Sequence, residues 1–344
     1  MGGVRVRRAD LSLAYEGGDL GAFIESETTS FSYTDHAHGA ADELSVTLKD
    51  DKGFWRGDWL PPKGAQIEAW IRTEDWRKPG DEEEIECGIF EISKLRLSGP
   101  PGRLNITALS TLVTKPFKRE RKNFPWMHTN LKDVARQIAE RNGLTLFWEA
   151  EGEVGLRIDR EDQRNQSDAS FLTKLAEKRG FNVKVRGEKL IVYSAAKYDA
   201  RPPVRTIRRN GGLVKSWSID TEAHDVYGSC RIEFYNPDRK KYFSHTYTPK
   251  NAPPSGAVHV VRRRCSSFAH AEHRAKWELR KANKVETKGS ITLIGDVTLF
   301  AGLTYELADF GKISGIYFAE QAAHSYSRGE GYTTTLSLRK VLPY

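Results

Sequence analysis

The sequence is poor in sulfur, with three cysteines and two methionines among 344 residues. Cys87, Cys230 and Cys265 are odd in number and far apart, which excludes a fully paired disulfide framework and suits a reducing compartment. No run approaches the roughly 18 apolar residues that a membrane-spanning helix needs. The first residues also lack the apolar core of a secretory signal. We therefore expect a soluble protein that is made in the cytoplasm and has no membrane partner.

Neither sign of charge dominates, because 54 basic residues face 46 acidic ones and the net charge is only +8. Nucleic-acid-binding domains usually concentrate basic and aromatic side chains on one element. Here the basic runs are scattered, so solvated loops are the favoured interpretation, although clustered Lys and Arg keep phosphate binding open as an alternative. The runs lie at residues 5–8, 115–122 and 262–264.

One short stretch, from Asp81 to Glu86, is strongly acidic. The preceding Lys-Pro-Gly at residues 78–80 is a turn signal. We interpret the stretch as the tip of a solvated hairpin, with a docking surface for a basic partner as the alternative.

The sequence also lacks the motifs of common catalytic sites. It has no phosphate-binding G-x-x-x-x-G-K-[ST] loop, no dinucleotide-binding G-x-G-x-x-G and no G-x-S-x-G nucleophile turn. Cys265, His270 and His273 are candidate metal ligands, but ordinary histidines on an amphipathic helix are favoured. His36 and His38 fit a loop better than a ligand pair. We therefore predict no catalytic, metal-binding or cofactor-binding residue, and a protein that is not an enzyme.

What the sequence has in abundance is short stretches in which apolar and polar residues alternate. Residues 44–48 and 104–107 are examples within the first 113 residues, and turn signals such as Pro100-Pro101-Gly102 separate them. This period of two is typical of strands with one polar face. Short strands with frequent turns predict a β-barrel or sandwich, which we assign to residues 1–115.

The pattern changes to helix and strand after residue 115. Asn130 is a candidate N-cap, and apolar residues follow it at helical spacing until Gly143. A similar unit recurs 37 positions later (175 − 138), with Ser167 or Asp168 as the candidate cap. Residues 116–203 are therefore predicted to form a small α/β domain of two helix-strand units.

Strand patterns return after Arg201-Pro202-Pro203 and are then interrupted. Residues 213–219 and 229–235 alternate, whereas residues 267–283 place their apolar side chains on one helical stripe. We predict a second β domain formed by residues 204–235 and 284–344. It is split by an insertion at residues 236–283 that contains one helix.

The two β domains carry a similar pattern, which suggests a duplication. In each, a glycine (Gly64 or Gly302) precedes a strand with one Glu, and a second strand opens with Gly-Ile-aromatic at Gly88 or Gly315. A tight turn and a return strand then follow. A duplicated β unit favours a protein built for symmetric assembly over one built around a single catalytic cleft.

The duplication makes a prediction about individual side chains. If the two strands are equivalent, Ile67 and Tyr305 occupy matching positions, and Glu68 and Glu306 lie on the opposite face, because side chains alternate along a strand. We expect the apolar pair to face the two barrel interiors. The glutamates are expected to point toward a channel or a neighbouring subunit.

The order of these patterns resembles the phage late control gene D family. Its members are tail hub proteins of contractile-tailed phages and phage-tail-like bacteriocins, and the hub part of type VI secretion spike proteins is similar. The resemblance covers nearly the whole chain, although each single motif is weak. It is carried by residues 165–177, 302–307, 315–317, 324–327 and 331–336.

The resemblance implies a mainly β fold with an α/β insertion: two tail-tube-like β-barrel domains plus a small helix-strand domain. It implies a homotrimer that forms a pseudo-sixfold ring and joins the hexameric tail tube to the trimeric central spike. Other baseplate proteins would be partners, and DNA would only pass through.

The particle would assemble in the host cytoplasm and be a phage virion, a bacteriocin or a secretion device. Because the chain ends at Tyr344, just after the last expected strand, fused spike or lytic modules are expected on separate chains. The alternatives are a tail-associated cell-wall hydrolase, suggested by unassigned carboxylates, and a nucleic-acid-binding protein.

Overall fold

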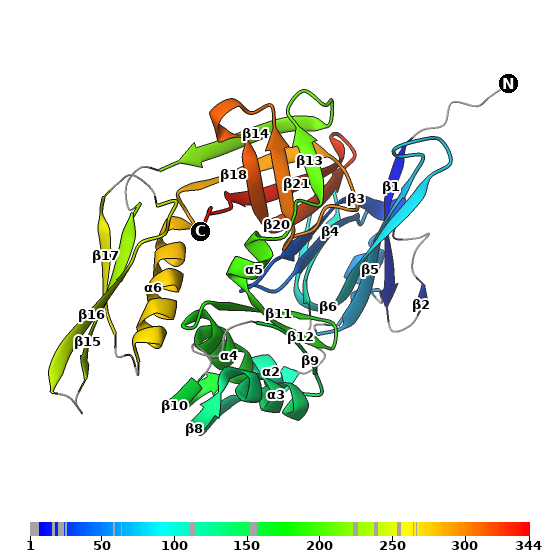
Figure 1. Ribbon diagram of the computed structural model, residues 1–344. Helices are drawn as coiled ribbons and strands as arrows, with labels where there is room; N and C mark the ends of the chain where they lie inside the picture. The colour runs from blue at the N-terminus through cyan, green and yellow to red at the C-terminus, as the bar shows by residue number, and fades with distance from the viewer. Residues whose placement is uncertain are drawn as a thin grey trace.

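A computed structural model of the chain is dominated by one 13-stranded sheet, with three smaller sheets around it (Figure 1). The predicted mainly β class is confirmed. None of the helices described is long and apolar enough to cross a membrane. The structure describes residues 7–15, 18–19, 24, 26–57, 59–62, 64–110, 115–150, 157–222, 226–236, 240–252, 256–263, 265 and 267–344.

The first part of the chain supplies one half of the large sheet. Its strands alternate buried and exposed side chains, as in β4, where Leu44, Val46 and Leu48 are fully buried. The elements are β1 (Arg8–Tyr15), β2 (Gly18–Asp19), β3 (Thr28–His36), β4 (Glu43–Lys49), η1 (Phe54–Arg56), β5 (Gln66–Glu74), β6 (Glu82–Ser98) and β7 (Arg103–Ser110).

The middle of the chain forms the two predicted helix-strand units, α3–β9 and α4–β11. The Asn130 side chain accepts a hydrogen bond from the backbone N–H of Asp133, and Ser167 caps α4 through the N–H of Ser170. A two-stranded antiparallel sheet of β8 and β10, which the sequence pattern did not predict, packs beside them. The elements are α2 (Lys115–Arg119), β8 (Arg121–Asn130), α3 (Leu131–Arg141), β9 (Thr145–Glu149), β10 (Arg157–Ser167), α4 (Asp168–Glu177), β11 (Phe181–Arg186), β12 (Lys189–Ser194) and α5 (Ala195–Asp199).

The last part of the chain supplies the other half of the large sheet. Its strands continue the first half edge to edge, in the order β14-β18-β21-β20-β3-β4-β7-β6-β5-β1-β2. The two predicted β domains thus share one sheet. The elements are β13 (Arg205–Arg208), β14 (Val214–Thr221), β18 (Thr287–Ile294), β19 (Thr304–Ala308), η2 (Gly311–Ile313), β20 (Gly315–Ser327) and β21 (Gly331–Lys340).

The insertion is larger than the sequence pattern suggested. The strand at residues 229–235, which we assigned to the second β domain, pairs instead with two insertion strands in a separate three-stranded sheet. That assignment was wrong because alternation identifies a strand but not its partner. A helix close to the predicted residues 267–283 is confirmed: α6 begins after Ser267, which caps it, and packs on this sheet through Ala271, Ala275 and Leu279. The elements are β15 (Ser229–Asn236), β16 (Lys241–Tyr247), β17 (Val258–Arg262) and α6 (Phe268–Asn283).

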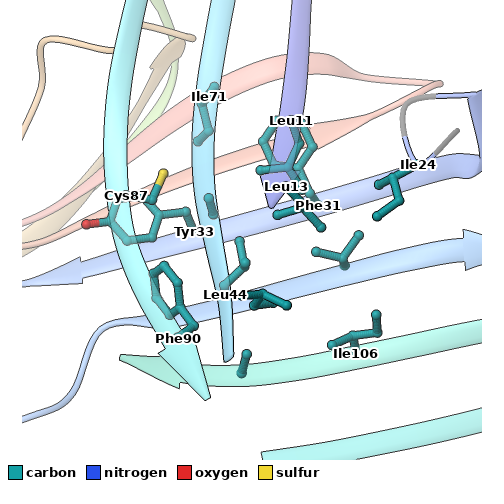
Figure 2. Close-up of a cluster of buried hydrophobic side chains, with 14 of the residues drawn as sticks. Leu11, Leu13, Ile24, Phe31, Tyr33, Leu44, Ile71, Cys87, Phe90 and Ile106 are labelled. Carbon is teal, nitrogen blue, oxygen red and sulfur yellow. The ribbon is translucent and has the colours of Figure 1, made fainter. Parts of the chain in front are cut away.

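Each region has its own buried cluster of apolar side chains. Figure 2 shows the cluster of the first β half, where Phe90 lies near Tyr33, and their ring centroids are 6.0 Å apart. The second β half buries Tyr305 and Tyr317 completely. Separate clusters lie in the helix-strand region and between α6 and its sheet. The cores therefore follow the regions that the sequence pattern distinguished.

Candidate assembly surface

The two halves of the large sheet repeat the same strand pairing at the predicted positions. In β5–β6, Ile67 lies opposite Phe90 and Glu68 opposite Ile89. In β19–β20, Tyr305 lies opposite Tyr317 and Glu306 opposite Ile316. Exposure follows the prediction too, because Ile67 and Tyr305 are 5% and 0% exposed while both glutamates are partly exposed. The equivalence of strands and faces is confirmed, whereas the partner that the glutamates face stays a prediction.

The equivalence extends to single backbone hydrogen bonds. Gly64 N–H donates to the Ile92 carbonyl at 3.1 Å, and Gly302 N–H donates to the Ala319 carbonyl at 2.8 Å. Both glycines have a positive φ, 83° and 82°, which explains why glycine stands at each position. The pairing register of β6 with β7 shifts after Ile92, and that of β20 with β21 shifts after Ala319. A register shift at the same place in both halves indicates a true structural repeat.

Five strands correspond between the repeats. Strands β3, β4, β5, β6 and β7 match β14, β18, β19, β20 and β21, with the same neighbours within each repeat. The register of β3 with β4 shifts after Thr28, and that of β14 with β18 shifts after Val214. The repeats differ beyond β5, where β1 runs antiparallel to it, whereas β13 runs parallel to β19. We call β3–β7 the first repeat, and β14 with β18–β21 the second repeat.

The repeats are joined by strand pairing between β20 and β3, which we call the internal joint. Residues 321–327 of β20 pair with residues 30–36 of β3 in antiparallel register. His324 lies opposite Tyr33, both are at most 1% exposed, and their rings stack with centroids 6.0 Å apart. Tyr326 stacks on Phe31 in the same way at 5.4 Å. The internal joint is therefore a packed part of the core.

A buried histidine closes a polar network beside the internal joint. The Nε2 of His324 lies 3.0 Å from the Leu299 carbonyl oxygen, which can only accept, so Nε2 carries the proton. The Tyr332 hydroxyl then donates to Nδ1 at 2.7 Å. Burial lowers the pKa of His324 to about 4, because the charged ring would lose its hydration. The neutral ring is thus the form that the joint holds.

A buried carboxylate ties the joint to the helix-strand region. The Nζ of Lys184 in β11 donates to Asp35 at 2.6 Å, and the backbone N–H of Ala301 donates to its other oxygen at 2.9 Å. The Tyr193 hydroxyl in β12 donates to the Ala37 carbonyl at 3.1 Å. One residue of the first repeat therefore holds both the second repeat and the helix-strand region.

The acidic stretch belongs to the β5–β6 hairpin, but only Asp81 lies in its turn, because residues 82–86 form the start of β6. Several of its charges have partners within the chain. The Asp81 carboxylate accepts hydrogen bonds from the backbone N–H groups of Trp76 and Arg77 at 2.6 and 2.9 Å. The Arg77 guanidinium reaches Asp296 of the second repeat at 2.6 Å and Glu83 at 3.4 Å. The hairpin therefore serves as a further tie between the repeats, and docking of a basic partner stays an untested alternative.

The other candidate residues from the sequence lie apart from one another. Cys265 is buried in the core between α6 and its sheet, whereas the Nε2 of His273 lies 3.2 Å from the Arg179 carbonyl oxygen. Burial lowers the pKa of His38 to about 4. Among the residues that the structure describes, no three His, Cys, Asp or Glu side chains are grouped to hold a metal ion.

The basic runs do not meet on one element. The first ends in β1, where Arg8 pairs with Glu74 at 4.0 Å, and Arg5 lies outside the described residues. The second run extends through α2 into β8. The third run starts at Arg262, the last residue of β17. In the second, Lys122 lies 3.3 Å from the buried Asp168, so it has a structural partner.

Solved structures of phage tail and secretion-system proteins share this fold, a duplicated β unit with a helix-strand insertion. A tail protein from Neisseria meningitidis MC58 matches it with a TM-score of 0.71 and 15% identity, covering 96% of each chain. The 43 kDa tail protein of prophage MuSo2 from Shewanella oneidensis matches with a TM-score of 0.71 and 11% identity, covering 97% of this chain and 98% of that one. A component of the type VI secretion system of E. coli matches with a TM-score of 0.61 and 10% identity, covering 96% and 76%. At these identities the likeness concerns the fold alone.

Sequence comparison adds curated relatives within that class. Probable baseplate hub proteins of Escherichia phages 186 and P2 are each 29% identical, over 198 and 208 residues. The matches cover 56% and 59% of this chain but only 48% and 51% of the relatives, so the chain aligns with about half of their length. No family model matches the chain. The chain is thus similar to baseplate hub proteins, which confirms the resemblance found in the sequence.

Proposed function

We propose that this protein is a structural baseplate hub whose three copies form a pseudo-sixfold ring between a hexameric tail tube and a trimeric central spike. The observation that carries the proposal is the pair of repeats with one register, lying edge to edge in one sheet. One chain presents two equivalent units, so three chains present six. Closed rings of identical chains use such head-to-tail contacts.

The buried polar groups support a structural role. His324 is held neutral between Tyr332 and Leu299, and Asp168 is fully buried among Arg141, Asn142 and Gln163. Each of these groups has partners within the fold, whereas a catalytic acid or base needs access to a substrate. The named relatives are tail and hub proteins.

The same proposal places the chain in a virion or tail-like particle that assembles in the host cytoplasm, with DNA as passing cargo only. We propose residues 1–115, 116–203 and the segments after 204 as its three parts. In this division the insertion begins at β15, because β15 pairs with the insertion strands β16 and β17.

The test is the mass of the assembled species. One chain has a mass of 38.9 kDa, so light scattering after size-exclusion chromatography should give three times that value, alone or with the co-expressed spike. Electron micrographs viewed down the ring axis should show six similar lobes. A stable monomer in the presence of both spike and tube proteins would contradict the proposal.

A further inference from the structure

Eight strands of the large sheet form a continuous band with two unpaired ends. The band runs β14-β18-β21-β20-β3-β4-β7-β6. Within the described residues, no strand pairs with β14 on the side away from β18. None pairs with residues 94–98 of β6 on the side away from β7. Unpaired edges expose backbone donors and acceptors and are ready to pair with another strand.

The internal joint shows how these two edges can meet. Strand β20, at the inner end of the second repeat, corresponds to β6 at a displacement of 227 positions (315 − 88). Strand β3, at the inner end of the first repeat, corresponds to β14 at a displacement of 186 (216 − 30). Moving the β20–β3 pairing by these displacements therefore predicts a β6–β14 pairing with a defined register.

The predicted register brings opposite charges together. Gln321 pairs with His36, and Ala323 pairs with Thr34, in the internal joint. The corresponding pairs are Lys94 with Glu222 and Arg96 with Asp220, and all four side chains are exposed. Opposite charges directly across an antiparallel pair are favourable, and like charges are unfavourable. The charges were not used to derive the register, so their agreement supports it independently.

The exposure of apolar side chains at these positions also supports the predicted pairing. His324 and Tyr33 of the internal joint are buried, whereas the matching Leu97 is 42% exposed and Ile219 is partly exposed. Trp217 is 43% exposed, although its counterpart Phe31 is 4% exposed. Large side chains left open at positions that the other repeat buries indicate a missing neighbour.

We infer that β14 of one copy pairs antiparallel with residues 94–98 of the next copy, with Arg96 opposite Asp220 and Leu97 opposite Ile219. The occupant is a second copy of this chain, because the template for the pairing is the chain's own joint. Each copy offers β6 at one end and β14 at the other, so the contact runs head to tail, which is the type of contact that builds a ring when the rotation between copies closes. The inference rests on the proposed function, since it specifies how the ring subunits touch.

Cysteine pairs test the register in the assembled full-length protein. Neighbouring cross-strand pairs alternate between two geometries, so we use both Arg96→Cys with Asp220→Cys and Leu97→Cys with Ile219→Cys. The matched control, Arg96→Cys with Ile219→Cys, places the thiols on opposite faces. The native cysteines are buried, so mild oxidation should spare them. We expect covalent dimers and trimers on a non-reducing gel from at least one test pair, and monomer from the control.

The outcomes separate the register from the ring. A trimer by light scattering in which neither test pair crosslinks, or in which the control crosslinks equally, overturns the β6–β14 pairing but leaves the hub proposal standing. A chain that remains monomeric with spike and tube proteins overturns both. Crosslinks to the tube or spike protein in place of self-crosslinks would show that another chain occupies the edge, and would also overturn the inference.

Charge reversal gives a second readout that needs no oxidation. Arg96→Asp sets two acids across the contact, so we expect the concentration for half-maximal assembly to rise about tenfold or more. Adding Asp220→Arg should restore assembly, because the pair is then reversed but complementary. Failure of the double variant to recover, with circular dichroism unchanged, would overturn the predicted pairing.

Discussion

The first and second repeats share a backbone plan but fill it with different side chains. Ile67 and Phe90 in the first repeat correspond to Tyr305 and Tyr317 in the second. Both tyrosines place their hydroxyls on backbone carbonyls, at Phe300 and Ile313. The repeats therefore share the pairing register of their strands, the positions of the register shifts and the positive-φ glycines. Side-chain identity is free to change wherever the new polar group finds a partner.

The repeats differ most at their edges. The β20–β3 edges are paired and carry one acidic residue, the buried Asp35, whereas the β6 and β14 edges are open and carry exposed charges at residues 94, 96 and 220. A charge at an exposed edge keeps its hydration and discourages indiscriminate strand pairing. The β20 and β3 edges belong to one chain, so covalent linkage brings them together. The β6 and β14 edges are open, and their charges limit which strands can pair with them.

The largest expected effect concerns Asp35, compared with its counterpart Thr221 on β14. Asp35→Ala removes a carboxylate whose side chain is 3% exposed and leaves the partly buried Lys184 ammonium with only the His36 carbonyl oxygen, at 2.7 Å, as its acceptor. We expect a loss of about 3–5 kcal/mol in the free energy of unfolding. Thr221→Ala, at an exposed position, should change it by less than about 0.5 kcal/mol. Urea denaturation followed by tryptophan fluorescence measures both, and similar losses would contradict the asymmetry of the edges.

A second effect depends on pH through His324. The folded pKa of His324, about 4, lies below the ordinary 6.5. The contribution of its neutral ring to the free energy of unfolding is therefore complete above pH 6.5 and is lost as the pH falls toward 4. The difference corresponds to about 3 kcal/mol. His324→Gln should flatten this part of the pH dependence of unfolding, whereas Leu97→Gln, at the matching position, should leave it unchanged. An identical pH profile for wild type and His324→Gln would refute the assignment.

A third effect probes strand spacing at Gly289, the counterpart of Leu44. A Cβ at Gly289 would lie 2.2 Å from the Ser218 carbonyl oxygen in β14, so Gly289→Ala must displace that strand. We expect about 1–3 kcal/mol of destabilisation. Amide exchange should accelerate in β14 but not in β3. Ser290→Ala is the neighbouring control, and uniform exchange across both strands would count against a local displacement.

The smallest effect is expected for the two glutamates. Glu68→Gln and Glu306→Gln lie on the exposed face, and Glu306 accepts a hydrogen bond from the Thr206 hydroxyl at 2.6 Å. We expect each to change the unfolding free energy of the isolated chain by less than about 0.5 kcal/mol. Thermal denaturation measures the stability of both variants. A large loss of stability in only one of them would mean that the two faces are not equivalent.

Local signals in the sequence predicted much of the fold. The caps at Asn130, Ser167 and Ser267 have side chains and spacings that identify helix starts without tertiary information. Gly64 and Gly302 were recognisable because a positive φ strongly favours glycine. The β8–β10 sheet was missed because its strands are mostly exposed and show no clear alternation.

Pairing between distant strands could not be predicted. The internal joint brings residue 321 beside residue 36, and no local pattern encodes such a partner. β15 was misplaced although its partner β16 follows directly in the chain, because alternation identifies a strand but not its partner. The complementary charges at Arg96 and Asp220 are visible in the sequence, yet they gain meaning only when the repeat fixes which residues face each other.

The internal joint also bears on how a ring of this kind forms. Because β20 and β3 belong to one chain, they meet at the high effective concentration that covalent linkage provides. Free subunits lose an estimated 4–15 kcal/mol of translational and rotational freedom at each association. A six-unit ring built from three two-unit chains therefore forms half of its joints during folding, independently of subunit concentration. Only the joints that join different chains respond to dilution, so ring formation can depend on protein concentration while the paired repeat itself does not.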